Sequence, residues 1–162
     1  MKAVSSIRRA AQIREIFWPI LGRLDDVDGF FNREFERAEP MVREVCTYVL
    51  DSGGKRLRPL LMVISARLCC YTGGDTHKFS TIFEFLHAAT LLHDDLIDGA
   101  TIRRGRPVAH TVWDNSSAVL VGDFLLARSL TIAAETGRPR IIRVIVASAL
   151  PVLFMAPMWQ AP

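Results

Sequence analysis

The sequence predicts an all-α fold. Apolar residues recur at helical spacing along most of the chain, and no run of alternating apolar and polar residues carries hairpin signals. Glycines and prolines divide the chain into helical segments. The length of 162 residues corresponds to one domain that can bury a core, and 50% hydrophobic with 23% charged residues is a globular composition.

The first part of the chain is expected to be helical up to a glycine-containing loop. A helix over residues 3–16 is amphipathic, because charged residues interrupt its apolar face, so it does not resemble a signal peptide. The next helix covers roughly 27–50 and is kinked or divided at Pro40. After the loop over 51–59, LLMVISARLCC is apolar almost all round, so we expect this helix to be buried.

Two further helices are predicted in the second part of the chain. The first covers residues 82–98, and Thr81 with Glu84 forms a capping box at its start. The second covers 118–135 and follows a loop that is rich in arginine.

The C-terminal residues differ from the rest of the chain. Residues 141–162 begin as a helix and then meet three prolines. Their apolar stretch approaches the length of a membrane-spanning helix, but Arg143 and the prolines argue against an integral membrane protein. We expect residues 1–149 to form the domain and 150–162 to be an aberrant or truncated tail, as after a frameshift.

Charge and cysteine usage exclude some classes of protein. A net charge of +3 and basic residues that alternate with acidic ones do not indicate a nucleic-acid partner. Cys46, Cys69 and the adjacent Cys70 form neither a disulfide framework nor a zinc motif. A reducing, cytoplasmic location is therefore expected.

An acidic cluster ends the helix predicted over 82–98. Asp94 and Asp98 are one turn apart, with Cβ atoms about 5–6 Å from each other, and Asp95 adds a third carboxylate. Like charges at a helix C-terminus are unfavourable, and a hard cation such as Mg²⁺ resolves the conflict. The alternative is a solvated acidic helix end that pairs with Arg103 and Arg104.

Two basic loops could hold phosphate groups. GGKRLRP places cations just before a helix N-terminus, where backbone N–H groups also favour anions: Lys55, Arg56 and Arg58. TIRRGRP adds Arg103 and Arg104, whose planar guanidinium groups suit diphosphate oxygens. The first loop alone could also be an ordinary solvated basic loop. Together with the acidic cluster, the loops predict a site for two diphosphates, one of them held through Mg²⁺.

These segments together resemble the N-terminal half of the trans-isoprenyl (polyprenyl) diphosphate synthases. The resemblance rests on GGKRLRP, FEFLHAATLLHDDLIDGATIRRGRP and NSSAVLVGDFLLARS, in this order, and extends from about residue 20 to about residue 148. It implies an isoprenoid synthase-type helical bundle, which is incomplete here. It also implies a magnesium-dependent prenyltransferase that joins isopentenyl diphosphate to an allylic diphosphate in isoprenoid biosynthesis, and a homodimer.

The resemblance assigns roles to individual residues. The catalytic and metal-binding part comprises Asp94 and Asp98 as Mg²⁺ ligands, Asp95 in support, and Arg103 on the allylic diphosphate. The isopentenyl diphosphate would be held by Lys55, Arg58, His87 and Arg104. His87 taken alone could be an ordinary core histidine, but it lies on the same helical face as Asp94 and Asp98.

Ala89 and Thr90 lie roughly one turn before the acidic cluster. In family members that make short products, bulky aromatic residues close the cavity in this area. Small residues here imply a medium or long polyprenyl product. The alternative is that they merely permit close helix packing.

One part of the family pattern is absent. The family carries a second aspartate-rich motif in its C-terminal half, whereas Asp94–Asp98 is the only D-D-x-x-D in this chain. We therefore expect this chain alone to be inactive. A non-catalytic regulatory or partner subunit of a prenyl synthase is the alternative. A terpene cyclase of related fold is disfavoured, because cyclases need no isopentenyl diphosphate site.

Overall fold

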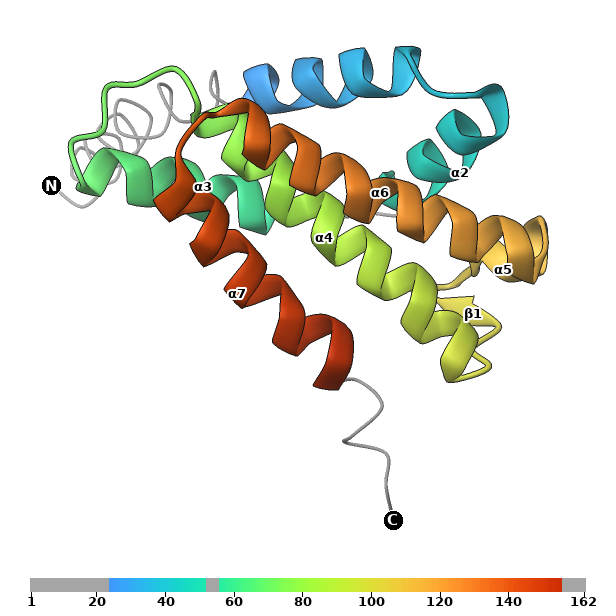
Figure 1. Cartoon of the computed structure of the whole chain (residues 1–162). Coiled ribbons are helices and arrows are strands. Elements are labelled where there is room, and N and C mark those ends of the chain that lie inside the picture. The colour runs from blue at the N-terminus through green and yellow to red at the C-terminus, as the bar shows by residue number, and fades with distance from the viewer. Residues whose placement is uncertain (1–23, 52–55, 156–162) are drawn as a thin grey trace, which may run out of the picture.

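The computed structural model describes residues 24–51 and 56–155, with side chains through residue 147, and it confirms the all-α fold (Figure 1). A helix over residues 24–36 comes first. The labelled helices are α2 (Pro40–Leu50), α3 (Leu57–Leu68), α4 (Thr76–Ile97), α5 (Ala109–Val112), α6 (Asn115–Glu135) and α7 (Pro139–Met155). The helix predicted over residues 3–16 lies outside the described residues.

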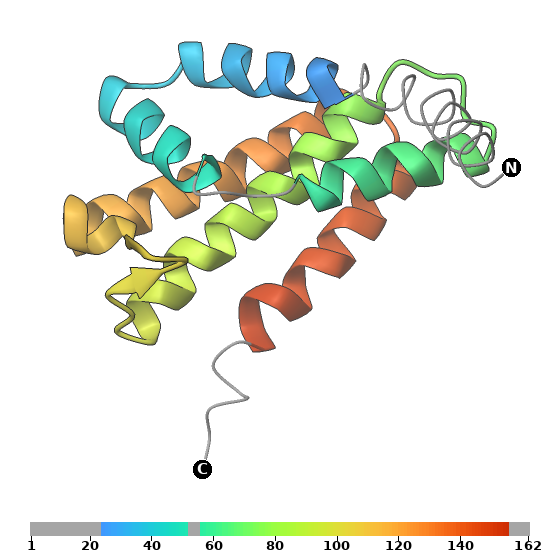
Figure 2. The ribbon, with the colours of Figure 1, turned by 180° about the vertical axis from the view of Figure 1, so that it is seen from behind.

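The central pair of the bundle is formed by α4 and α6, which run side by side in both views (Figures 1 and 2). α3 packs on α4, and the helix over 24–36 lies across the same pair. Phe85 of α4 stacks against Phe31 and Phe35, with ring centroids 5.4 and 5.3 Å apart. These aromatic contacts join the first described helix to the core.

Pro40 divides the chain into two helices instead of kinking one. Proline is well suited to the first turn of α2, because the N–H group that it lacks would have no helical partner there. Arg43 of α2 then donates hydrogen bonds to the carbonyl oxygens of Phe35 at 3.0 Å and Glu36 at 2.8 Å. The arginine thereby satisfies acceptors at the end of the preceding helix.

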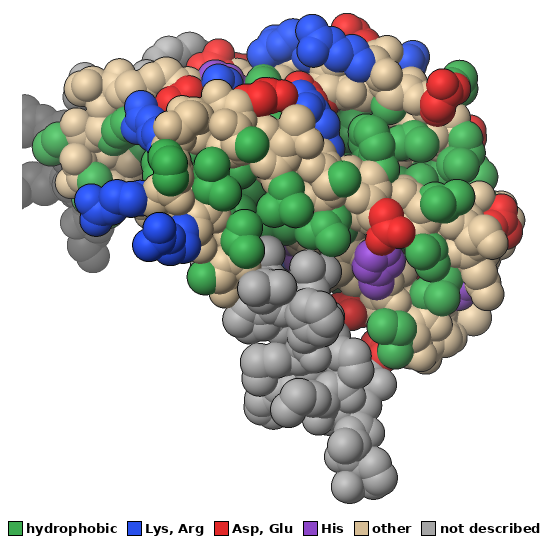
Figure 3. Space-filling model, viewed as in Figure 1, with side chains coloured by type: hydrophobic (Ala, Val, Ile, Leu, Met, Phe, Trp, Pro, Cys, Tyr) green, Lys and Arg blue, Asp and Glu red, His purple; other side chains and the backbone are tan. Residues whose placement is uncertain are grey.

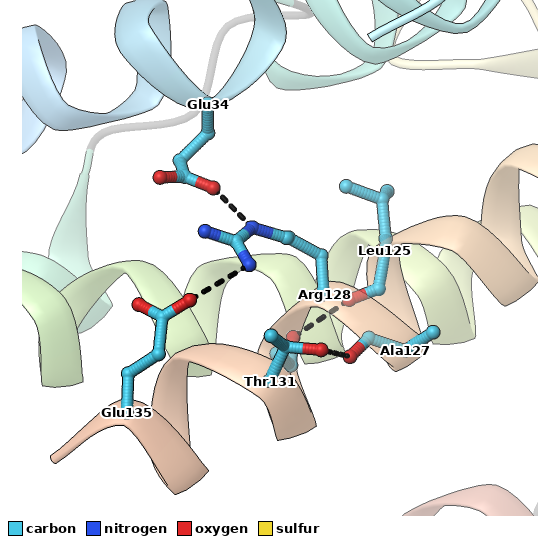
Figure 4. A network of polar contacts seen from close by, with 7 residues as sticks. Glu34, Leu125, Ala127, Arg128, Thr131 and Glu135 are labelled. Atoms are coloured by element: carbon cyan, nitrogen blue, oxygen red, sulfur yellow. Dashed lines mark hydrogen bonds and ion pairs between the residues drawn. The ribbon is translucent and has the colours of Figure 1, made fainter. Parts of the chain in front are cut away.

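A partly buried ion-pair network also fastens the helix over 24–36 to α6 (Figure 4). Arg128 of α6 donates from Nε to the carboxylate of Glu34, which is 7% exposed. Its Nη1 donates to Glu135 at 3.1 Å. Because Glu34 is buried, loss of Arg128 would leave an uncompensated charge inside the bundle.

α4 begins earlier than predicted, and the predicted capping box is wrong. The helix starts at Thr76, and Thr81 lies within it, where its hydroxyl donates to the carbonyl oxygen of His77 at 2.9 Å. Glu84 is buried and lines a cavity instead of capping a helix end. Thr81 thus bonds to the backbone of its own helix instead of capping it.

The prediction that the helix after Pro59 is buried is also wrong. In α3 only Pro59 and Val63 are buried, whereas Leu57, Leu61 and Leu68 are 55%, 62% and 80% exposed. One face of α3 packs on α4, and the described residues leave the other face uncovered.

The arginine-rich loop forms a short hairpin that packs on α2. Strand β1 (Ile102–Arg103) pairs antiparallel with β2 (Arg106–Pro107). The turn residues Arg104 and Gly105 have φ values of 52° and 76°, as a tight two-residue hairpin requires. Tyr48 of α2 donates to the carbonyl oxygen of Pro107 at 2.7 Å, which fixes the hairpin beside the end of α4.

The end of the chain concerns the predicted domain boundary, and α6 concerns the prediction that the protein is not integral to the membrane. The backbone of α7 is helical through Met155, so the predicted tail starts within a helix, and the boundary at residue 150 stays a prediction. By length and composition alone, α6 is the one helix among the described residues that could cross a membrane. Its packing against α4 is what the core helix of a bundle also shows.

Candidate active site

A cavity of about 390 Å³ lies where α3, α4 and the hairpin meet. Its charged lining comes from Arg56, Arg58 and Arg104, together with His87 and Glu84. Three of the residues predicted to hold isopentenyl diphosphate, Arg58, His87 and Arg104, are thus brought together. The fourth, Lys55, lies outside the described residues.

The N-terminus of α3 contributes to this cavity. Arg56 is the N-cap and has a φ of 46°, so the chain turns sharply into the helix there. Its Nε lies 3.2 Å from Asp28, and its guanidinium stacks over the ring of Phe31. Arg58 follows in the first helical turn, where the helix dipole also favours an anion.

His87 faces these arginines from α4. Burial and then the positive charges of Arg58, Arg104 and Arg103 together lower its pKa to about 4. The imidazole is therefore neutral at neutral pH. A bound anion would offset the charge of the arginines and favour protonation of the imidazole.

Glu84 is a site residue that the sequence reasoning missed. It lies one turn before His87, so the i, i+3 spacing in an apolar helix was a signal for it. Its side chain is 9% exposed, and Arg58 Nη1 lies 3.9 Å from Oε2. Burial raises the pKa of this carboxyl, although Arg58, Arg56 and Arg104 act in the opposite direction.

The acidic cluster at the end of α4 is divided between two environments. Asp95 is 7% exposed, its Oδ1 accepts a hydrogen bond from Arg103 Nε at 2.8 Å, and Arg103 Nη2 lies 2.7 Å from the same oxygen as an ion pair. The alternative in which the helix end pairs with an arginine therefore holds for Asp95 and Arg103. Arg104 instead faces the cavity that contains Arg58.

Asp94 lines a second cavity, of about 270 Å³, between α4 and α6. Burial raises its pKa, and the negative charge of Asp98 raises it further. The two carboxylates suit a divalent cation, which would relieve this repulsion. Within the described part of the chain no three His, Cys, Asp or Glu side chains converge as a metal site.

The two predicted chain-length residues have different surroundings. Thr90 lines the cavity beside Asp94, and its hydroxyl donates to the carbonyl oxygen of His87 at 2.8 Å. Ala89 is fully buried in the core of the bundle. Thr90 is thus the one of the two that borders free space.

His93 and Gly122 fix how closely α6 approaches this cavity. His93 Nε2 lies 3.5 Å from Asp123 Oδ1 and 3.4 Å from the carbonyl oxygen of Val119. A Cβ atom on Gly122 would lie 2.3 Å from the same nitrogen. A glycine is therefore required at this position for the imidazole to keep its place.

An all-α bundle that presents an arginine-lined cavity and paired carboxylates from one helix has the features of the isoprenoid synthases. The sequence profile of the family described as Polyprenyl synthetase matches residues 39–155. The chain belongs to this family, as the sequence predicted.

Individual relatives agree with this assignment. An all-trans-nonaprenyl-diphosphate synthase (geranyl-diphosphate specific) of Rhodobacter capsulatus is 38% identical over 75% of this chain and 38% of its own length. Component 2 of the heptaprenyl diphosphate synthase of Geobacillus stearothermophilus is 42% identical over 60% of this chain and 30% of its own. The crystal structure of a polyprenyl synthase from Caulobacter crescentus complexed with calcium and isoprenyl diphosphate superposes with a TM-score of 0.72. It is 30% identical and covers 86% of this chain and 42% of its own. The chain thus spans less than half the length of these relatives.

Proposed function

We propose that this chain is the N-terminal, diphosphate-binding part of a polyprenyl diphosphate synthase, a prenyltransferase of isoprenoid biosynthesis. The observation that carries the proposal is the cavity in which Arg58, His87 and Arg104 meet. The guanidinium groups of Arg56, Arg58 and Arg104 and the N-terminus of α3 lie at this one cavity. Their positive charge complements the negative charge of a diphosphate. The family membership and the solved relative with isoprenyl diphosphate support the same ligand class.

One substrate would lie beside the middle of α4, around His87, and the other beside its end, at the acidic cluster. Arg58, His87 and Arg104, with Lys55, would hold isopentenyl diphosphate and orient its double bond. Arg103 would reach the allylic diphosphate beside the acidic cluster. The reaction breaks the bond from the allylic carbon to its diphosphate, joins that carbon to the isopentenyl double bond, and releases a proton. The apolar surfaces around the cavities would exclude water from this step.

The cofactor in this proposal is Mg²⁺, held by Asp94 and Asp98 with Asp95 in support. When bound, it would neutralise charge on the departing diphosphate. The pKa of Asp94 is raised first by its burial and then by the negative charge of Asp98, and a bound cation would offset both effects. The calcium in the solved relative supports a divalent metal in the family.

Ligand binding by the purified 162-residue chain tests the proposal. In calorimetry, isopentenyl diphosphate is expected to bind with or without Mg²⁺, whereas geranyl diphosphate is expected to require Mg²⁺. Arg58→Gln should abolish isopentenyl diphosphate binding, and Arg33→Gln, which changes an exposed arginine outside the cavity, should not. Equal effects of the two variants would sink the proposed site.

We further propose that the chain alone does not turn over, since its one D-D-x-x-D motif supplies half of the family's metal ligands. A chain that converts both diphosphates to product would contradict this. It would leave the binding proposal intact.

A second candidate function is a non-catalytic partner subunit of a prenyl synthase. It is favoured by the relative that is one component of a heptaprenyl diphosphate synthase. Co-purification with a full-length synthase, together with a change in that enzyme's activity, would distinguish this function from a broken enzyme. We also propose that the protein is cytoplasmic, which agrees with its three free cysteines. We further propose that it is a homodimer and is not integral to the membrane.

A further inference from the structure

The cavity that contains Arg58 also holds a carboxylate that anion binding by arginines does not explain. Glu84 lines the cavity, its side chain is nine-tenths buried, and its Oε2 has no hydrogen-bond partner among the described residues. Its ion-pair partner Arg58 lies with Nη1 3.9 Å away, which is beyond hydrogen-bond distance. A buried acceptor of this kind is costly unless a ligand satisfies it.

The groups around Glu84 are mostly cationic. Arg56 and Arg58 face it from the start of α3, Arg104 from the hairpin, and His87 from the next turn of α4. Asp28 faces it from the helix over 24–36. Every arginine here can only donate hydrogen bonds, so each can bind an ionised phosphate oxygen. Glu84 is an acceptor, and it would repel such an oxygen.

We propose that Glu84 accepts a hydrogen bond from a protonated oxygen of the bound diphosphate, so that the cavity selects the protonated form of the anion. The arginines then bind the ionised oxygens of the same group. This inference rests on the proposed diphosphate function. It makes Glu84 a specificity-determining residue that discriminates phosphate-type anions, which carry a proton near neutral pH, from sulfonate-type anions, which do not.

The raised pKa of Glu84 fits a carboxyl that shares a proton with its ligand. His87 offers a different route to pH dependence, because an anion would also favour its protonation. Protonation of His87 would strengthen the binding of any anion of the same charge. The ratio of the affinities for a protonatable and a non-protonatable anion therefore isolates Glu84 from His87.

The test is calorimetry on the full chain with isopentenyl diphosphate and methanedisulfonate between pH 6 and 8.5. The last proton of a phosphate monoester dissociates with a pKa of about 6, so the affinity ratio should fall roughly tenfold per pH unit above about pH 7. Glu84→Gln should reduce the ratio by roughly tenfold or more at pH 6.5 and tighten methanedisulfonate binding. Asp28→Asn is the matched control, because Asp28 pairs with Arg56 and does not line the cavity, and it should leave the ratio unchanged.

Several results would overturn the inference. If the affinity ratio of Glu84→Gln stays within twofold of the wild-type ratio, the carboxylate does not select between the two anions. If Glu84→Gln weakens the binding of both anions equally, Glu84 only positions the arginines. If the variant does not fold, a flat ratio in the wild-type chain is sufficient to reject the idea. Failure of the wild-type chain to bind either anion would instead reject the proposed function itself, and this inference with it.

Discussion

Arg103 donates from Nε to Asp95 Oδ1 at 2.8 Å, and its Nη2 forms an ion pair with the same oxygen at 2.7 Å. The pair ties the hairpin to the last turn of α4. It also divides the acidic cluster, because Asp95 is engaged within the protein while Asp94 lines the cavity beside α6.

Asp95→Asn should loosen this connection. The buried oxygen of Asp95 would keep at most a neutral hydrogen bond, so we expect a loss of about 1–3 kcal/mol in the free energy of unfolding, measured with urea. Asp25→Asn, at an exposed carboxylate of the helix over 24–36, is the control and should change it little. Similar losses in both variants would mean that the pair contributes nothing specific.

His87 should make stability depend on pH. Its pKa is about 4 in the folded chain and 6.5 as the ordinary value, so the unfolded chain binds the proton more readily between these limits. Stability is then full above about pH 6.5 and decreases as the pH falls toward 4. Urea unfolding of His87→Gln should lack this part of the decrease. An unchanged pH profile would show that His87 is not held in its neutral form.

Gly122→Ala should destabilise the packing of α6 on α4. The added Cβ would lie 2.3 Å from His93 Nε2, and relief of such a contact costs about 1–3 kcal/mol. The double variant with His93→Ala should recover most of the loss, as thermal unfolding would measure. Additive losses would show that the clash is with something other than the imidazole.

Thr90 should influence product length when this segment works in a complete enzyme. In a chimera that carries residues 39–147 in a full-length relative, Thr90→Phe should fill the cavity beside Asp94 and shorten the product, as chromatography of the prenyl chains would show. Thr90→Val is the control of similar size. Ala89→Phe should mainly destabilise the protein by about 1–3 kcal/mol, because Ala89 is fully buried in the core.

The exposed face of α6 should pair two copies of the chain. Hydrophobic side chains follow α6 across the face seen in Figure 3, and Leu120 and Leu130 are 60% and 39% exposed. Leu120→Glu combined with Leu130→Glu should give monomers in light scattering. Leu61→Glu, on the exposed face of α3, should leave the dimer intact. The reverse outcome would move the interface to α3.

The acidic cluster was predictable because its residues stand close together in the sequence and helical spacing puts Asp94 and Asp98 on one face. The anion cavity joins Arg58, His87 and Arg104, which are far apart in the sequence, so its prediction depended on the resemblance to the family. Glu84 was assigned instead to a capping box, since a local motif cannot reveal that α4 begins a turn and a half earlier, at Thr76. The apolar residues of α3 indicated burial but not what would cover them. Which acid pairs with Arg103 depended on the hairpin, whose position is set by Tyr48 of α2.

α4 runs without interruption from Thr76 to Ile97, so the register of one helix sets how the two proposed diphosphate sites face each other. Deleting a single residue between His87 and Asp94 would rotate the acidic cluster by about 100° relative to the anion cavity, since a helix has 3.6 residues per turn. Inserting seven residues there would nearly restore the rotation but move the sites about 10 Å further apart. The number of residues between His87 and Asp94 thus sets the distance between the reacting groups. Substitutions keep this number, whereas insertions and deletions change it.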